Sequence, residues 1–160
     1  MNVYARICAD AQVMRYMLPG RAVSHAEAAF DVQNLREHWR EHGFGHWAVE
    51  EKESGRLVGR TGLKHHDTWT LDPENTEVGY LYDRAVWGRG YATEGACASI
   101  AYAFETLDRK EVISIALPEN AASLRVMEKA GLSYAGATRW EARGIDVVWY
   151  SRRRDPAQSP

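Results

Sequence analysis

Two glycines, Gly88 and Gly90, flank an arginine in the stretch VWGRGYATEG, immediately before a run with helical spacing. Glycine inside a helix costs stability, so glycines at a helix start need a local reason. The first amides of a helix have no partner within the helix, and the helix dipole adds partial positive charge there. Small residues let an anion approach this backbone, so the loop predicts a phosphate or pyrophosphate site.

Two arginines near the loop, Arg84 and Arg89, are candidates to add positive charge to this site. On the loop alone, a plain strand-to-helix turn explains the glycines equally well. The stretch lacks the Gly-Lys-Ser/Thr ending of a Walker sequence and the three spaced glycines of a dinucleotide fingerprint. The phosphate interpretation therefore depends on the rest of the chain.

Hydrophobic spacing and turn residues predict the elements that position the loop. A capping box formed by Ser24 and Glu27 begins one helix. Helices are expected over 3–16, over 24–42, from the loop to about Leu107, and within 119–131. Strands are expected over 46–52, 57–65, 76–82, 112–117, 132–142 and 145–153.

A strand–helix–strand unit in the middle of the chain makes 76–82 and 112–117 a parallel pair, whereas the flanking hairpins are antiparallel. We expect one α/β domain over 1–152, with a mixed sheet and helices on its faces. The segment 153–160 is expected to be a flexible tail.

Composition excludes several classes of protein. The 160 residues carry a net charge of −2 and no apolar run long enough to span a membrane, so neither a nucleic acid nor a membrane is an expected partner. The N-terminus lacks the pattern of a signal peptide. Cys8 and Cys97 have no metal or redox spacing, are expected to be small buried side chains, and favour a cytoplasmic setting.

The stretches EVGYLYDRAVWGRGYATEG and ALPENAASLRVMEKAGL, in this order and with this gap, resemble the GNAT superfamily of acetyl-CoA-dependent N-acetyltransferases. The branch that they resemble contains the ribosomal-protein N-terminal acetyltransferases RimJ and RimL, and the resemblance runs from Ala9 to Tyr150. It implies the GNAT fold, a mostly antiparallel mixed sheet with a splayed parallel pair. The family's first strand is missing here, so strand 46–52 is expected at a bare edge, which favours a homodimer.

The resemblance also implies acetyl-CoA as co-substrate. The backbone from Gly88 to Thr93 would hold the pyrophosphate, and Asn120 would bond the pantetheine arm, although it also fits a helix N-cap. Trp87 departs from the family's Gln or Arg, so the loop is expected to act through its amides. The residues implied to bind the cofactor are Tyr80, Leu81, Tyr82, Trp87, Gly88, Arg89, Gly90, Tyr91, Ala92, Thr93 and Asn120.

For catalysis, Glu77 is the first candidate for the base that takes the proton of the amine, with a solvent-facing strand residue as the alternative. Many relatives carry a tyrosine as acid where this chain has Met127, which cannot donate a proton. Ser123, one helical turn earlier, matches a serine of this branch and is the candidate to protonate or bond the thiolate. A helix hydroxyl bonded to its own backbone is the alternative for Ser123.

The acceptor is open among a protein N-terminus, an amino acid and a small-molecule amine. Residues expected to line its pocket are Tyr16, Trp47, His65, His66 and Trp69. Because His65 and His66 lack a ligand partner at metal spacing, no metal is expected and surface histidines are favoured. Alternatives to an enzyme are a non-catalytic acyl-CoA-binding module and, more weakly, a nucleotide-binding protein.

Overall fold

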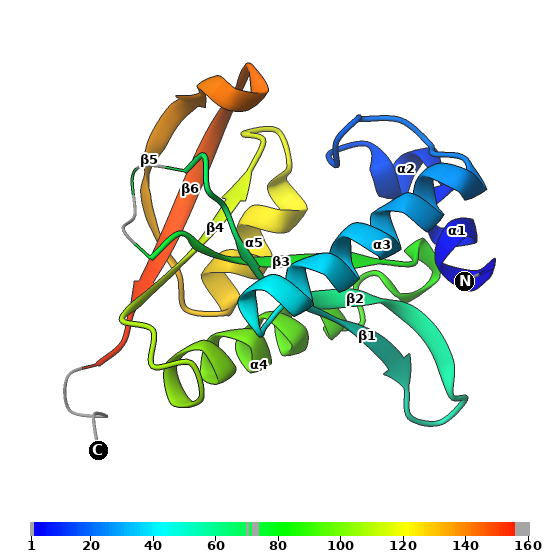
Figure 1. Ribbon diagram of the computed structural model, residues 1–160, viewed down its shortest axis with the longest axis horizontal. Helices are drawn as coiled ribbons and strands as arrows, with labels where there is room; N and C mark the ends of the chain where they lie inside the picture. Colours follow the sequence, from blue (N-terminus) through cyan, green and yellow to red (C-terminus); the bar gives the residue numbers. More distant parts are fainter. Residues whose placement is uncertain (1, 70, 72–73, 156–160) are drawn as a thin grey trace.

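The computed structural model describes residues 2–69, 71 and 74–155 (Figure 1). Six strands form one sheet in the order β1-β2-β3-β4-β6-β5. Only β3 and β4 are parallel, and the other neighbours are antiparallel. The strands are β1 (His46–Glu51), β2 (Arg56–His65), β3 (Thr76–Tyr82), β4 (Glu111–Ala116), β5 (Ser133–Trp140) and β6 (Ile145–Arg153).

The helices cover the two faces of this sheet. On one face, α4 and α5 pack on Leu63 and Val78 in the largest apolar cluster. On the other face, the first three helices pack on Leu81 in a second cluster. The helices are α1 (Asn2–Cys8), α2 (Ala11–Met14), α3 (His25–His42), α4 (Tyr91–Glu105) and α5 (Ala121–Lys129), and the short 3-10 turns are η1 (Arg84–Val86) and η2 (Glu141–Arg143).

The parallel pair separates almost as soon as it forms. Between β3 and β4 the only register pair among the described residues is Glu77 with Ile113. Beyond it the hydroxyl of Ser114 donates to the carbonyl of Val78 at 2.9 Å, in place of a backbone partner. The mixed α/β fold with a splayed parallel pair is therefore confirmed.

Local signals in the sequence set several element ends correctly. Ser24 and Glu27 form both bonds of the capping box at the start of α3, and Gly43 ends that helix in the left-handed conformation. The prediction of a single helix over 3–16 is wrong, because the first helix ends at Cys8. The carboxylate of Asp10 accepts the amide of Gln12 and starts α2 as a separate helix.

Two expectations concern the cysteines and the C-terminal end. Cys8 is buried, but Cys97 is exposed on α4, so the expectation that both are buried is wrong for Cys97. Arg153 is the last residue of β6, and Arg154 donates to the carbonyl of Phe104 and to Asp108. Of the expected tail 153–160, residues 156–160 lie outside the described part of the chain.

Gly62 lets β1 approach β2 closely. It has a φ of +148°, and a Cβ there would fall on the carbonyl oxygen of Gly45. Gly45 leads directly into β1, whose first residue pairs with Gly62. A side chain at this position would therefore push the edge strand away from the sheet.

Gly62→Ala should lower the free energy of unfolding by about 3 kcal/mol, because backbone strain and overpacking each cost about 1–3 kcal/mol. Gly55→Ala is the matched control, since Gly55 also has a positive φ, +65°, but a Cβ there meets nothing within 4 Å. Urea denaturation of both variants measures the difference. Equal losses would show that the contact with Gly45 is relieved without cost.

Candidate active site

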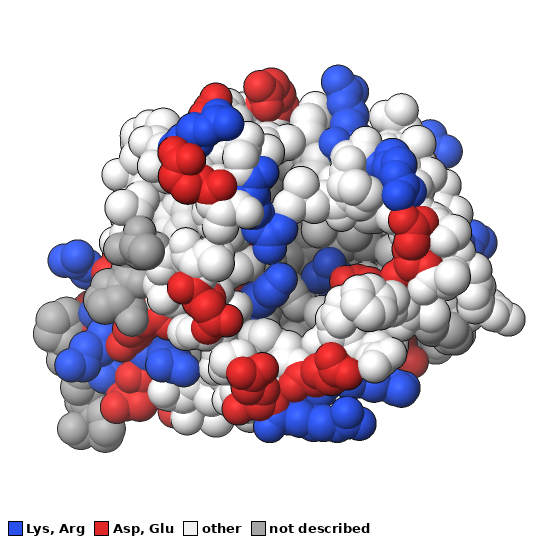
Figure 2. All heavy atoms as spheres, turned by 45° about the horizontal axis from the view of Figure 1, so that its top comes forward, with Lys and Arg blue, Asp and Glu red and all other residues white. Residues whose placement is uncertain are grey.

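A cavity of about 560 Å³ opens where β3 and β4 separate. Its lining includes residues from both faces of the sheet, with Glu77 and His66 on the α3 side and Tyr80 and Ser123 on the α5 side. Helices α1–α3 and the tip of the β5–β6 hairpin flank the opening (Figure 1). The space-filling view shows this hollow with basic side chains around it (Figure 2).

The backbone of β3 alternates between β2 and the open gap. The amide of Asp83 donates to the carbonyl of Val58 on β2 at 2.8 Å, so odd-numbered residues of β3 face β2. The carbonyl of Val78 accepts from Ser114 on β4, so even-numbered residues face the gap. Tyr80 and Tyr82 therefore direct their backbone groups into the cavity.

Leu81 differs from its two neighbours. It pairs with Arg60 of β2, and its side chain packs against the first helices. The indole Nε1 of Trp87 donates to the carbonyl of Tyr82 at 3.0 Å. This bond occupies the last carbonyl of β3 and leaves the Tyr82 amide facing the cavity, whereas the amide of Leu81 faces β2.

The glycine loop ends in an open helix terminus. Gly88 and Gly90 have φ values of +75° and +90°, and a Cβ at either position would meet nothing within 4 Å. Gly90 is the N-cap of α4 and provides no side-chain cap. In the part of the chain that the structure describes, the amides of Gly88, Gly90, Tyr91, Ala92 and Thr93 donate to no other group. A row of free donors at a helix N-terminus is suited to an anion.

The arginines near the loop are already paired. Arg89 lies 3.0 Å from Glu51 and stacks over Tyr91, and Arg84 lies 3.0 Å from Asp10. Their charges are therefore partly neutralised by carboxylates. The groups of the loop that remain free to meet an anion are its amides.

On the α5 side of the gap, the hydroxyl groups of Tyr80 and Ser123 are hydrogen-bonded to each other at 2.9 Å. Burial raises the pKa of Tyr80 to about 12, so the phenol keeps its proton at neutral pH. Asn120 is the N-cap of α5, where its side-chain oxygen accepts the amide of Ser123 at 3.2 Å. Met127 is 1% exposed within the main core and does not line the cavity.

On the opposite face, the carboxylate of Glu77 is hydrogen-bonded to Nε2 of His66. Burial disfavours the charged carboxylate, but the hydrogen bond and charge of His66 outweigh it and lower the pKa of Glu77. His66 is 7% exposed and lies edge-on to Trp140, with ring centroids 4.9 Å apart. The expectation that His66 is a surface histidine is wrong.

The other residues expected in the acceptor pocket separate into two groups. Tyr16 lines the cavity beside His66. Trp69 is buried against Trp140, His65 bonds to Asp67, and Trp47 lines a different cavity. Sequence reasoning missed Lys64, Arg143 and Trp140, which line the cavity from β2 and from the β5–β6 hairpin. A cation opposite Glu77 in the β2–β3 ladder was the available signal for Lys64.

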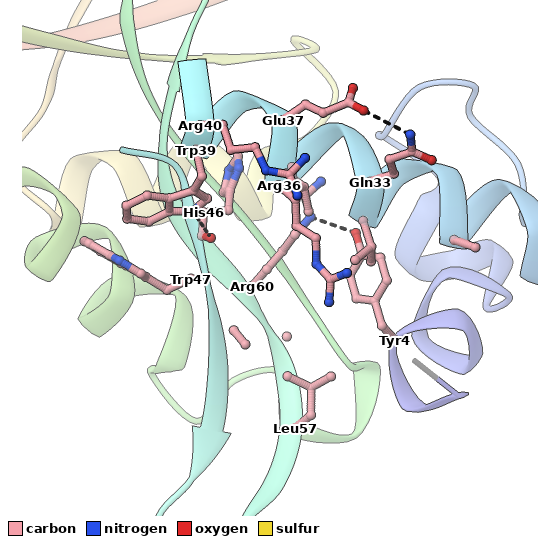
Figure 3. Close-up of a pocket in the computed structure, with 15 residues that line it drawn as sticks. Tyr4, Gln33, Arg36, Glu37, Trp39, Arg40, His46, Trp47, Leu57 and Arg60 are labelled. Atoms are coloured by element: carbon pink, nitrogen blue, oxygen red, sulfur yellow. Dashed lines mark hydrogen bonds between the residues drawn. The ribbon is translucent and has the colours of Figure 1, made fainter. Parts of the chain in front are cut away.

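A second cavity of about 810 Å³ lies between α3 and the β1–β2 edge of the sheet (Figure 3). Arg60 donates from its Nε to the hydroxyl of Tyr4 at 2.8 Å, and Trp39 donates to the carbonyl of His46. His46 lines both cavities, and its Nε2 has no partner among the described residues. Burial holds the pKa of His46 well below its usual range, so the ring is neutral at pH 7.

No three His, Cys, Asp or Glu side chains among the described residues lie close enough together to hold a metal ion. None of the helices in that part of the chain has the length and apolar character needed to cross a membrane.

Comparison with known proteins places this geometry in a family. The chain matches the acetyltransferase (GNAT) domain over residues 1–133. The uncharacterized N-acetyltransferase p20 of Bacillus licheniformis is 26% identical over 156 residues, which cover 94% of this chain and 85% of that protein. Uncharacterized protein YkkB of Bacillus subtilis (strain 168) is 34% identical over 114 residues, 70% of this chain but only 63% of that protein.

Solved structures agree with the sequence match. An acetyltransferase from Agrobacterium tumefaciens str. C58 superimposes with a TM-score of 0.78 at 25% identity, over 96% of this chain and 84% of that chain. The overall fold of this chain is thus shared with that acetyltransferase. The chain belongs to the GNAT family of acetyltransferases, whose members take the acetyl group from acetyl-CoA.

Proposed function

We propose that the chain is an acetyl-CoA-dependent N-acetyltransferase that acts on a primary amine by direct attack on the thioester, with 1–152 as one catalytic domain. The observation that carries this proposal is that one cavity joins the β3–β4 gap to the Glu77–His66 pair and reaches Trp87 and Ala92 of the glycine loop. The RimJ/RimL-like branch belongs to the same proposal and rests on the motifs alone.

The residues present fit acetyl-CoA as the acetyl donor. The free amides between Gly88 and Thr93 would hold the pyrophosphate, where both glycines leave open space. The backbone of Tyr80 and Tyr82 would pair with the pantetheine arm in the place of β4. Acetyl-CoA supplies an acetyl group activated as a thioester. The amide of Tyr82 would stabilise the oxyanion that develops during transfer.

Glu77 and His66 form the base of this proposal. Because the pKa of Glu77 is lowered, the carboxylate is charged at neutral pH, and it is hydrogen-bonded to the adjacent imidazole. A proton from the amine would therefore pass to this pair, directly or through water. The carboxylate also orients the ring, which is packed on Trp140.

Tyr80 and Ser123 would stabilise the leaving group. The Tyr80 hydroxyl keeps its proton at neutral pH and lies on the α5 side of the gap, where it would donate a hydrogen bond to the thiolate as it forms. Ser123 orients the phenol through the hydroxyl pair. Many relatives carry a tyrosine at the position of Met127 on α5, but here that position is part of the core. The phenol in the cavity comes instead from Tyr80 on β3.

A non-catalytic acyl-CoA-binding module is the second candidate. It would need the free amides of the loop but not the buried Glu77–His66 pair, whose desolvation costs free energy.

The free thiols Cys8 and Cys97 support a reducing, cytoplasmic setting, and the net charge of −2 supports a function without nucleic acid.

Gly88→Asp should weaken coenzyme A binding at least ten-fold, because it places a carboxylate beside the amides that hold the pyrophosphate. Gly43→Asp is the matched control: Gly43 also has a positive φ, +73°, with open space at its Cβ, but it caps α3 on the other face. Thermal-shift titrations with acetyl-CoA, coenzyme A and ATP provide the measurement. Equal weakening by both variants, or a stronger shift with ATP, would contradict the assignment of the loop.

Glu77→Gln should lower kcat by about 10²–10⁴-fold, the usual contribution of a positioned base, and leave acetyl-CoA affinity unchanged. Glu105→Gln on the exposed end of α4 is the control and should keep full activity. Thiol release with a panel of amines measures turnover. Unchanged turnover in the Glu77 variant would exclude this base, and no turnover in the parent protein with intact acetyl-CoA binding would favour the binding module.

We also propose that β1 pairs with β1 of a second copy, because it is an edge strand with unpaired backbone groups. The carbonyl of Gly45 accepts from Leu63 on β2, so by alternation the amide of Ala48 faces outward. Ala48→Pro would remove that outward amide without breaking the β1–β2 ladder.

Light scattering should therefore detect a dimer in the parent protein and in Ala48→Ser, but a monomer in Ala48→Pro. The serine variant keeps the backbone amide and controls for the change of side chain. A clean monomer of the parent protein at micromolar concentration would contradict the proposal.

A further inference from the structure

The acceptor side of the cavity contains more cationic than anionic groups. Its lining on that side includes the cations Arg60, Lys64 and Arg143, and the carboxylates Asp31 and Glu77. Basic side chains are accordingly visible around the hollow in Figure 2. The acceptor must bind among these charged groups. The charge that suits the acceptor therefore depends on which of the groups are already paired within the protein.

Both carboxylates have partners within the protein. Asp31 accepts from the hydroxyl of Tyr4 at 2.5 Å and lies 4.0 Å from the Arg60 guanidinium. Glu77 is paired with His66. Neither carboxylate is therefore free to attract a second cationic group on a substrate.

Two of the cations have no such partner. Lys64 is opposite Glu77 in the β2–β3 ladder, yet neither it nor Arg143 forms a salt bridge within the described residues. Lys64 is largely removed from solvent, and this burial lowers its pKa. Arg143 lies at the mouth of the cavity, where its guanidinium stacks on Trp140 at 4.6 Å. The charge of Glu77 acts on both cations, but this one carboxylate is also hydrogen-bonded to His66. Positive charge therefore remains in excess on this side of the cavity, and a bound anion would balance it.

Much of the remaining wall on this side is apolar, and Gln12 and His46 are its other polar residues. Tyr16, Met17 and Leu18 line it from the segment that follows α2, and Ile145 and Val147 line it from β6. A ligand that satisfies both the cations and these walls combines an anionic group with an apolar body. Its amine must lie beside the Glu77–His66 pair.

We propose that the acceptor is an amine that also carries a carboxylate, with the charge pattern of a free apolar α-amino acid, and that Lys64 and Arg143 bind this carboxylate. The inference rests on the proposed function and narrows it. Lys64, beside Glu77, lies where a carboxylate one carbon away from the attacking amine would be. Arg143 is at the open end and holds the ligand from the solvent side.

The test compares three ligands that differ only at the carboxylate: L-phenylalanine, L-phenylalaninamide and phenethylamine. The amide has the most easily deprotonated amine, so intrinsic reactivity alone would favour it. Recognition of the carboxylate should instead give L-phenylalanine a kcat/KM at least ten-fold above both others. The amide also represents a peptide N-terminus, and a preference for it would overturn the proposal in favour of a protein acceptor.

Variants then identify the groups responsible. Lys64→Met and Arg143→Gln should each reduce the ratio of kcat/KM for L-phenylalanine over phenethylamine at least five-fold. Because the ratio is taken within one variant, it cancels any general loss of folded enzyme. Lys110→Met is the matched control and should leave the ratio unchanged, because Lys110 is an exposed lysine immediately before β4. Unchanged ratios in both site variants would overturn the roles of Lys64 and Arg143.

Calorimetry on the coenzyme A-saturated protein separates this inference from the proposed function, because it needs no turnover. Tighter binding of L-phenylalanine than of phenethylamine supports the carboxylate site even if no amine is acetylated, and in that case only the proposed activity fails. Equal or tighter binding of phenethylamine overturns the inference while acetyl transfer stands. Absence of binding by all three ligands up to 10 mM also counts against the inference.

Discussion

The separation of β3 from β4 is the constraint on which the rest of the site depends. Buried backbone groups must find partners, so a sheet can open in its middle only if other groups take over. Ser114 and Trp87 do this for two carbonyls of β3, and the remaining amides face a cavity. The opening thereby converts a stretch of ordinary strand into a row of oriented donors at the centre of the molecule.

The same opening divides the chemistry between two layers. Side chains alternate along β3, and Glu77 and Tyr80 are three residues apart, so they lie on opposite faces of the sheet. Glu77 meets His66 beneath the β5–β6 tip, and Tyr80 meets Ser123 on α5. In the proposed mechanism, the group that accepts the amine proton and the hydroxyls that meet the thiolate would thus lie on either side of one strand, with the rigidity of the sheet fixing the distance between them.

Much of this arrangement could be predicted from local sequence patterns. The capping box of α3, the glycine loop and the strand–helix–strand unit each depend on residues close in the chain. The burial of His66 could not, since it depends on Trp140 folding back from a distant hairpin. For the same reason nothing near Lys64 or Arg143 in the sequence marks them as residues of one cavity, and the burial of Met127 in the main core also depends on distant contacts. Which distant side chains a residue meets on its face of the sheet is decided by long-range contacts.

One consequence concerns the order in which ligands can come and go. The glycine loop opens on the face of α4 and α5, whereas the cations and His66 are reached from the side of α1–α3 and the β5–β6 tip. Two ligands that enter from different sides do not block each other's path. An enzyme built in this way can hold both substrates at once and pass the acyl group between them without storing it on a side chain, so its steady-state kinetics would be sequential and free of a ping-pong pattern.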